Sequence, residues 1–347
     1  KWWIAKWRFM QRIDLIPQHF RQGAERMAHA FRDLDQVIVA AHVNPDGDAA
    51  GAVAAACHVL RSMGKEFMVY AQPGLPAYLD FFPMPGVVHT TLEHPPFKPR
   101  CAVLLDCGEP DRLGRELAAR LPELVTINID HHLGGNGMGS AANWVDPTAA
   151  ATAQLVAYVA LAADLPLTGD LATAIALGII TDTGGFCHGN TSADVLYLTA
   201  HMVEHGCDIA LLREKLENTW SRGRLSLWGQ LLQRASLERG GSVCFCPVYL
   251  EDLRKCGALK EDIEGFVEQL RRLRGVHVAA VLREDSPTSC KFSLRSYGSI
   301  DVRAAAVRLG GGGHRNAAGG TLRADLAAAS TQLLAAIAEE LDAEGIA

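Results

Sequence analysis

Short apolar runs alternate with longer Ala-rich or Leu-rich stretches along the first part of the chain. Each run of five or six apolar residues is followed by a polar turn and then by a stretch with helical spacing, as in QVIVAA followed by residues 48–63. Runs of this kind are typical of parallel strands that helices cover on both faces. The pattern therefore predicts an α/β fold with strands at QVIVAA (36–41), EFMVYA (66–71), CAVLLD (101–106) and LVTINID (124–130).

Two segments with a helical pattern follow these runs, and the elements of a second unit follow the two segments. Residues 148–180 are rich in Ala and Leu, and a helical pattern over 192–220 ends in the polar turn TWSRGR. The remaining pattern predicts a smaller α/β unit that includes one helix over 251–274 and a Gly-rich turn at 310–313. We therefore predict an N-terminal extension over 1–15, a first domain over 16–205, a linker over 206–221 and a second domain over 222–347.

Composition and charge agree with two domains of different character. The chain has 347 residues, of which 49% are apolar, which is enough for two ordinary cores. Residues 1–206 hold 14 Lys and Arg against 21 Asp and Glu, whereas residues 207–323 hold 19 against 13. This asymmetry predicts that the first domain binds cations and that the second attracts a polyanion.

The sequence also indicates in which cellular compartment the protein is expected. No run of eighteen apolar residues is present, so we expect no membrane span. The nine cysteines are scattered and form no C-x-x-C pair, which favours the reducing cytoplasm. The opening KWWIAKWRFM lacks the features of a secretion signal, and we interpret it as an extension ahead of Met10; a native first element or a membrane-surface anchor are the alternatives.

Five aspartates stand where an apolar run ends. Asp46 and Asp48 follow the first run, Asp106 and Asp130 close two others, and Asp182 follows ALGIIT, which could equally be the end of a helix. In open α/β sheets the carboxyl ends of the strands line the ligand-binding crevice, so these acids could converge there. For any one of them, the alternative is an ordinary helix N-cap or turn former.

The grouping of these acids with histidines favours a metal site. The pattern H-x-x-x-D-x-D at 42–48 supplies one imidazole and two carboxylates from a loop that Pro45 stiffens, and residues 130–132 add a carboxylate and two imidazoles. Converging carboxylates repel one another unless a cation lies between them. Carboxylate with some imidazole suits hard or borderline ions such as Mn²⁺. No Walker sequence is present, which argues against NTP-driven action.

These segments resemble the ordered motifs of the DHH phosphoesterase family. The four N-terminal motifs correspond to HVNPDGDAAG (42–51), Asp106 in LLDCGEPDRLG, DHH (130–132) and Asp182 in GIITDTGGF. FSLRS (292–296) and GGGHRNAAGG (311–320) resemble the C-terminal domain of its nucleic-acid-acting members. The resemblance covers roughly residues 20–345, and the layout is most similar to the nano-RNase group of bifunctional oligoribonucleases and 3′-phosphoadenosine-5′-phosphate (PAP) phosphatases. It implies a parallel-sheet catalytic domain with helices on both faces and a smaller α/β substrate-binding domain.

The resemblance also implies residue roles. It implies two Mn²⁺ ions, with Mg²⁺ or Co²⁺ as alternatives, bridged by the catalytic Asp106. It implies that His132 contacts a phosphate oxygen or assists the leaving group and that Asp130 orients an imidazole. The implied ligands are His42, Asp46 and Asp106 for one ion and Asp48, Asp106, His131 and Asp182 for the other. The implied substrate contacts are Ser293, Arg295, Gly312, Gly313, His314 and Arg315.

The function that the resemblance implies is hydrolysis of short RNA or linear dinucleotides to nucleoside 5′-monophosphates by a cytoplasmic homodimer, together with action on PAP. A cyclic-di-AMP phosphodiesterase and a non-catalytic nucleotide sensor are the alternatives. A family II pyrophosphatase is expected to lack GGGHRNAAGG, and a RecJ-type exonuclease needs additional modules. An RNA-binding module acting through the basic section predicts steeply salt-sensitive binding that needs no metal.

Overall fold

The computed structural model describes residues 15–135, 137–218 and 220–346, so almost all of the predicted extension over 1–15 lies outside the described residues. The chain divides into two compact units, residues 1–218 and 219–347. Most of the predicted linker over 206–221 is helix α8 (Ile209–Glu217). Its Leu212 is buried in the core of the first unit, so this segment packs with the first unit instead of connecting two domains freely.

A six-stranded parallel sheet forms the centre of the first unit. Its strand order is β3-β2-β1-β4-β5-β6, and every neighbouring pair is parallel. The four predicted strands are confirmed, whereas β3 and β6 were missed because their short segments carry no apolar run. The strands are β1 (Val37–Ala40), β2 (Phe67–Tyr70), β3 (Val88–His89), β4 (Cys101–Leu105), β5 (Val125–Asp130) and β6 (Ala142–Val145).

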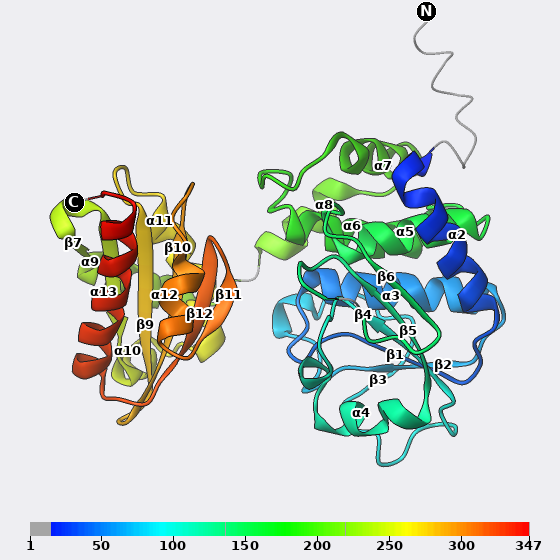
Figure 1. Cartoon of the computed structure of the whole chain (residues 1–347), viewed down its shortest axis with the longest axis horizontal. Helices are drawn as coiled ribbons and strands as arrows, with labels where there is room; N and C mark the ends of the chain where they lie inside the picture. Colours follow the sequence, from blue (N-terminus) through cyan, green and yellow to red (C-terminus); the bar gives the residue numbers. More distant parts are fainter. Residues whose placement is uncertain (1–14, 136, 219, 347) are drawn as a thin grey trace, which may run out of the picture. The chain divides into compact units, whose positions relative to one another are not determined.

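Helices cover both faces of this sheet, as the apolar runs predicted. Val37 and Val39 of β1 face one core, and Ile38 and Ala40 face the other, because side chains alternate along a strand. Figure 1 shows α4 on the side of the sheet opposite to α2, α5 and α6. The helices of this unit are α2 (Gln18–Arg32), α3 (Gly47–Ser62), α4 (Arg115–Arg120), α5 (Thr152–Ala162), α6 (Gly169–Asp182), α7 (Ala193–Glu204) and α8.

Helices α3 and α6 pack closely through glycines. A Cβ atom added at Gly51 would lie 2.5 Å from the carbonyl oxygen of Ala174, and one at Gly47 would meet the side chain of Thr181. The start of α3 therefore lies beside the end of α6. This close approach brings Asp182, the last residue of α6, next to the segment that follows β1.

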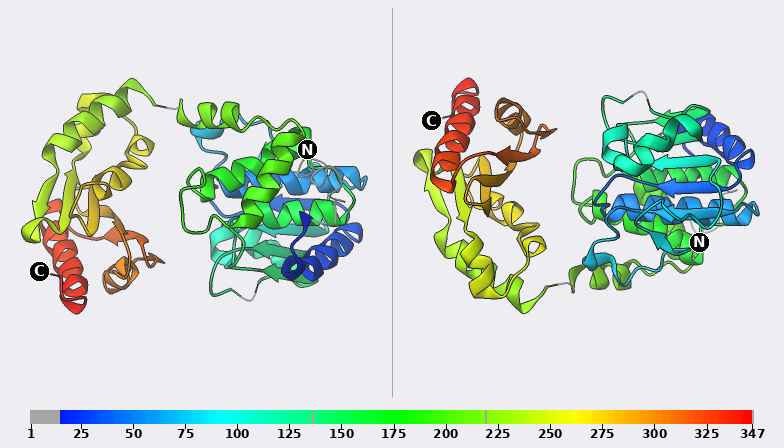
Figure 2. Two further views of the ribbon diagram at one scale, coloured as in Figure 1. Left: turned by 90° about the horizontal axis from the view of Figure 1, so that it is seen from above. Right: turned by 90° about the horizontal axis from the view of Figure 1, so that it is seen from below.

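The second unit contains a six-stranded sheet with both parallel and antiparallel strand pairs, in the order β11-β12-β10-β9-β8-β7. Helices α12 and α13 cover one face, and α9, α10 and α11 cover the other. Figure 2 shows the red α13 and the yellow-green α9 on different sides of the strands. The strands are β7 (Ser236–Glu238), β8 (Val243–Val248), β9 (Val278–Ser286), β10 (Ser289–Ser296), β11 (Gly312–His314) and β12 (Ala317–Leu322), and the helices are α9 (Arg222–Arg234), α10 (Leu250–Cys256), α11 (Phe266–Arg271), α12 (Val302–Arg308) and α13 (Leu326–Ala343).

Two predictions for this unit were wrong. The single helix predicted over 251–274 is divided into α10, a 3₁₀ turn and α11, because Gly257 and Gly265 adopt the left-handed conformation that ends or precedes a helix. The turn predicted at 310–313 overlaps strand β11, which pairs with β12. The predicted α/β architecture of both units is confirmed.

Candidate active site

The candidate site lies where the strand order of the parallel sheet reverses. The connection from β1 leads to β2 on one side, whereas β4 and β5 lie on the other side, which makes the β1–β4 boundary a topological switch point. Asp46 and Asp48 come after β1, Asp106 follows β4, and His131 and His132 follow β5. The carboxyl ends of these strands thus deliver acids and imidazoles to one place.

One group of side chains joins His42, Asp46 and Asp106. Nε2 of His42 lies 3.5 Å from Oδ2 of Asp106 and 4.0 Å from Oδ2 of Asp46. Oδ1 of Asp46 accepts hydrogen bonds from the backbone N–H groups of Asp48 and Ala49. Asp46 is therefore a helix N-cap through one oxygen and a member of this cluster through the other, so the two interpretations of this residue are compatible.

A second group joins Asp48, His131 and Asp182 around the same Asp106. Nε2 of His131 lies 3.8 Å from Asp48, 3.5 Å from Asp106 and 3.4 Å from Asp182. Asp182 is the end of helix α6, which settles the alternative that the sequence left open. The two groups meet at Asp106, which uses Oδ2 toward His42 and Oδ1 toward His131. This geometry would allow two cations to share one carboxylate.

Backbone carbonyls set the orientation of two imidazoles. Nδ1 of His42 lies 2.9 Å from the carbonyl oxygen of Val43, and Nδ1 of His131 lies 3.3 Å from that of Ala149. A carbonyl only accepts, so each Nδ1 carries a proton and each Nε2 faces the carboxylates, where it can bind a cation once it is deprotonated. This arrangement is typical of metal-binding histidines.

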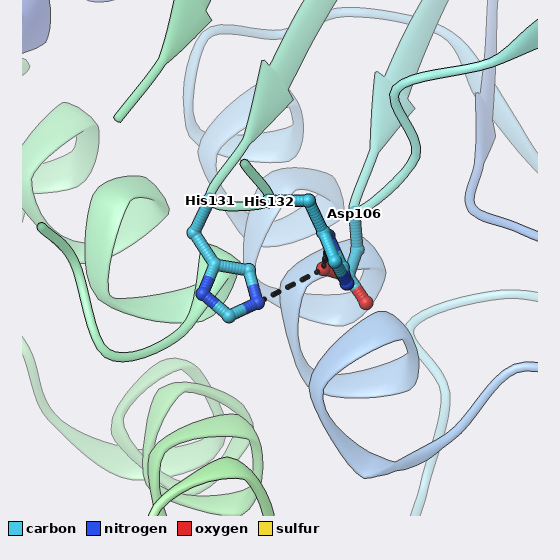
Figure 3. Close-up of side chains that lie close together, drawn as sticks. All are labelled: Asp106, His131 and His132. Carbon is cyan, nitrogen blue, oxygen red and sulfur yellow. Dashed lines mark ion pairs between the residues drawn. The ribbon is translucent and has the colours of Figure 1, made fainter. Parts of the chain in front are cut away.

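His132 points toward the same carboxylate but is held differently. Nδ1 of His132 lies 2.8 Å from Oδ1 of the fully buried Asp130 and 3.5 Å from Oδ1 of Asp106. Figure 3 shows both imidazoles beside Asp106. The hydrogen bond to Asp130 raises the pKa of His132 despite its burial. A partly exposed imidazole of this kind can donate a proton to an anionic ligand near neutral pH.

Thr152 and Asn190 complete the site, and the sequence did not reveal either residue. The backbone N–H groups of Thr152 and Ala153 donate to the two oxygens of Asp48, and the Thr152 hydroxyl donates to Oδ1 of Asp106. Nδ2 of Asn190 donates to the carbonyl oxygens of Ala150 and Asp182. Neither residue stands out in an Ala-rich helix start or a polar loop, so the sequence offered no signal for them.

The electrostatics of the cluster favour bound cations. Burial, together with the charge of Asp106, raises the pKa of Asp48 well above its usual range, and burial raises that of Asp182 to about 6. Burial also opposes ionisation of Asp106, but the hydrogen bond from His42 and the neighbouring imidazoles lower its pKa to about 2. Across residues 15–135, 137–218 and 220–346, no Lys or Arg forms an ion pair with these three acids. Divalent cations are therefore a suitable counter-charge, and the oxygen and imidazole donors fit them.

Four of the six predicted substrate contacts, Ser293, Arg295, Gly312 and His314, share one face of the second sheet. Register places Gly312, Gly319 and Ser293 in one row across β11, β12 and β10, and His314, Ala317 and Arg295 in the next row on that face. Nε of Arg295 lies 2.7 Å from Oε1 of Glu268 on α11, so this guanidinium is already paired. Gly313 points to the other face and has a φ of 134°, a conformation that favours glycine. Arg315 donates to the carbonyl oxygen of Ser299.

Comparisons with known proteins agree with this fold. Residues 36–179 match the DHH family N-terminal domain, and residues 243–343 match the DHHA1 domain. The chain is 34% identical to the bifunctional oligoribonuclease and PAP phosphatase NrnA of Thermus thermophilus, over 89% of this chain and 91% of that protein. It is 24% identical to the protein of the same name from Bacillus subtilis, over 83% of this chain and 90% of that protein.

A solved structure agrees over almost the whole chain. An exopolyphosphatase-related protein from Bacteroides fragilis has a TM-score of 0.85 at 25% identity, covering 92% of this chain and 96% of that one. RecJ from Thermus thermophilus in complex with Mn²⁺ shares the fold at a TM-score of 0.54 and 14% identity, covering 94% of this chain and 55% of that one. The fold and the site together define a metal-dependent hydrolase. The chain belongs to the DHH family of phosphoesterases.

Proposed function

We propose that this enzyme is a two-metal phosphodiesterase that hydrolyses short oligoribonucleotides or linear dinucleotides to nucleoside 5′-monophosphates and also dephosphorylates PAP. The observation that carries the proposal is Asp106, whose two oxygens face two separate groups of carboxylate and imidazole ligands. The substrates follow from the relatives named oligoribonuclease and PAP phosphatase, which match this chain over most of its length.

We assign the cation ligands by these two groups. His42, Asp46 and Asp106 would hold one Mn²⁺ ion, and Asp48, Asp106, His131 and Asp182 would hold the other, with Mg²⁺ or Co²⁺ as alternatives. Such a pair supplies an activated water and neutralises the charge that develops on the phosphate. Asp130 fixes the orientation of the His132 ring through Nδ1, and we assign to this imidazole a contact with a phosphate oxygen or proton donation to the leaving group.

The second unit would bind the substrate phosphate. Ser293, Arg295 and His314 lie on a face whose intervening positions are Gly or Ala, which leaves room for a ligand against the sheet. Gly312, Gly313 and Arg315 are the further predicted contacts. Glu268 accepts from Nε of Arg295, and the carbonyl oxygen of Leu294 accepts from Nη1, so the guanidinium is held in place for a phosphate at its remaining donors.

A substrate panel tests the proposal. A diribonucleotide, a 20-nucleotide RNA, PAP and cyclic-di-AMP are each assayed with Mn²⁺ and with Mg²⁺, and the products are separated by chromatography. We expect Mn²⁺-dependent release of 5′-monophosphate, with faster turnover of the diribonucleotide than of the 20-mer. Faster cleavage of the 20-mer would overturn the assignment to short RNA, preferred cleavage of cyclic-di-AMP would favour the cyclic-dinucleotide alternative, and metal-dependent binding without any product would favour the nucleotide sensor.

We further place the enzyme in the cytoplasm, as a homodimer. All nine cysteines lie in the described part of the chain and are free, which suits a reducing compartment. No helix among the described residues is both long and apolar enough to cross a bilayer. The homodimer stays a prediction from the family, and light scattering after size exclusion tests it by giving the mass in solution.

A further inference from the structure

A tyrosine extends the row of predicted phosphate contacts on β10. Ser293 and Arg295 alternate onto the same face of this strand, and Tyr297 is the next position in that alternation, directly after the strand ends. Helix α11 contacts both of the last two side chains, since Glu268 pairs with Arg295 and Arg271 stacks on Tyr297. Glu268 and Arg271 are three residues apart on the helix, and they contact Arg295 and Tyr297, which are two residues apart along the strand direction.

The ring of Tyr297 contacts Arg271 and is about half exposed. The guanidinium carbon of Arg271 lies 4.2 Å from the ring centroid, and Nη1 of Arg271 also donates to the carbonyl oxygen of Ser296. Tyr297 nevertheless remains 51% exposed. A ring that an arginine supports from behind presents a flat π-surface to which another planar group can stack.

The surroundings of this ring suit a polyanion. Arg272 and Arg274 directly follow α11 and are exposed, and Arg315 is tied to the carbonyl oxygen of Ser299 just beyond Tyr297. Two acids lie near this row: Glu268 is paired with Arg295, and Glu344 accepts a hydrogen bond from the hydroxyl of Ser299. Aromatic rings beside positive charge are the usual means by which proteins bind single-stranded nucleic acid without reading its sequence.

We propose that Tyr297, supported by Arg271, is the stacking platform for the nucleobase next to the phosphate that Arg295 binds. This inference rests on the proposed function, and it adds a base-binding subsite to the phosphate contacts. Two residues along a strand span about 7 Å, so the Cα atoms of Tyr297 and Arg295 are separated by roughly one nucleotide unit. Because every base has a π-face, the subsite binds purines and pyrimidines without strict selection.

Variants of two tyrosines test the platform. Tyr297→Ala removes the ring and Tyr297→Phe keeps it, while Tyr249→Ala is the matched control. Tyr249 is 44% exposed and stacks on Arg234 at 5.0 Å, but it follows the end of β8 that pairs with Arg283, at the other end of the sheet. The substrates are a diribonucleotide and an abasic analogue with the same phosphodiester.

We expect Tyr297→Ala to raise KM for the diribonucleotide by about 10-fold or more, with kcat within about twofold, and to leave the abasic analogue unaffected. Tyr297→Phe and Tyr249→Ala should behave like the wild type. An equal loss on both substrates would assign the ring a merely structural role, and an unchanged KM for the diribonucleotide would remove it from binding. Either result overturns the platform.

A binding experiment without catalysis separates this inference from the proposed function. Calorimetric titration with AMP and with ribose 5-phosphate, both in EDTA, compares a ligand with and without a base. We expect the wild type to prefer AMP and Tyr297→Ala to lose that preference. If the wild type hydrolyses no dinucleotide but keeps this tyrosine-dependent preference, the proposed function fails and the platform stands; if no preference exists, the platform fails.

Discussion

The hydroxyl of Thr152 donates a 2.9 Å hydrogen bond to Oδ1 of Asp106, while the backbone N–H of the same residue donates to Asp48. One residue at the start of α5 thus orients two carboxylates of the cluster. The hydroxyl stabilises the ionised form of Asp106, which is the form that binds a cation.

Replacing Thr152 with valine keeps the shape of the side chain and removes this donor. We expect Mn²⁺ affinity to fall by roughly 10–100-fold, as is usual when a group that supports a metal ligand is lost. Calorimetric Mn²⁺ titration measures this directly. Thr152→Ser retains the hydroxyl and should bind Mn²⁺ like the wild type; equal affinity in the valine variant would show that the hydrogen bond does not support binding.

Asp106→Asn should abolish turnover without unfolding the chain. On the proposed assignment Asp106 is a ligand of both cations, so its loss would weaken the binding of both, and we expect the rate to fall at least about 10³-fold. In the metal-free protein the same change relieves repulsion with Asp48 and Asp182 but also removes the attraction between Asp106 and the neighbouring imidazoles, so the two effects on stability oppose each other. Circular dichroism and thermal unfolding should therefore match the wild type.

The exposed Asp80→Asn is the control for Asp106→Asn, because it changes the net charge equally outside the site. It should keep full activity. Substantial Mn²⁺-dependent activity in a folded Asp106→Asn protein would exclude the bridging role.

Stability should respond to pH in opposite ways with and without metal. The pKa of Asp182 is raised to about 6 and that of Asp48 is also raised, so the folded metal-free protein binds protons that the unfolded chain, with a carboxyl pKa of about 4, does not. These two acids therefore make the metal-free protein more stable as pH falls from about 6 toward 4. Asp106, with its pKa of about 2, acts oppositely and loses its contribution between about pH 4 and pH 2.

Cation binding requires the deprotonated ligands, so stabilisation by Mn²⁺ should grow as pH rises. We expect the difference in Tm between Mn²⁺-loaded and EDTA-treated protein to be larger at pH 8 than at pH 5. Differential scanning fluorimetry at both values measures this difference. A constant difference would mean that the buried acids do not release protons on metal binding.

Gly178→Ala should disturb the site through packing alone. An added Cβ would lie 2.5 Å from Oδ1 of Asp48 and would also meet the side chain of Ala153. We expect about 1–3 kcal/mol lower unfolding free energy, together with weaker Mn²⁺ binding. Gly189→Ala is the matched control, since a Cβ there has nothing within 4 Å, and it should change neither quantity.

The sequence by itself predicted the parallel sheet and the positions of the acids. Apolar runs reveal buried strands because both faces of such strands must be apolar, and residues at the ends of parallel strands meet at one edge. His42, Asp46, Asp106 and His131 could therefore be expected to converge from the sequence pattern. The breaks in the helix predicted over 251–274 were not recognised, although Gly257 and Gly265 are residues of the type that commonly ends a helix, and the structure places both in the left-handed conformation.

Only the tertiary structure decided which atoms face one another. Asp182 joins the cluster because Gly47 and Gly51 let α3 approach α6, and Thr152 joins it because α5 begins against Asp48. Such contacts join residues about 100 positions apart, as Thr152 and Asp48 show, and no local pattern encodes them. The chemistry of the side chains can thus be read along the chain, whereas their mutual geometry follows from how the helices pack.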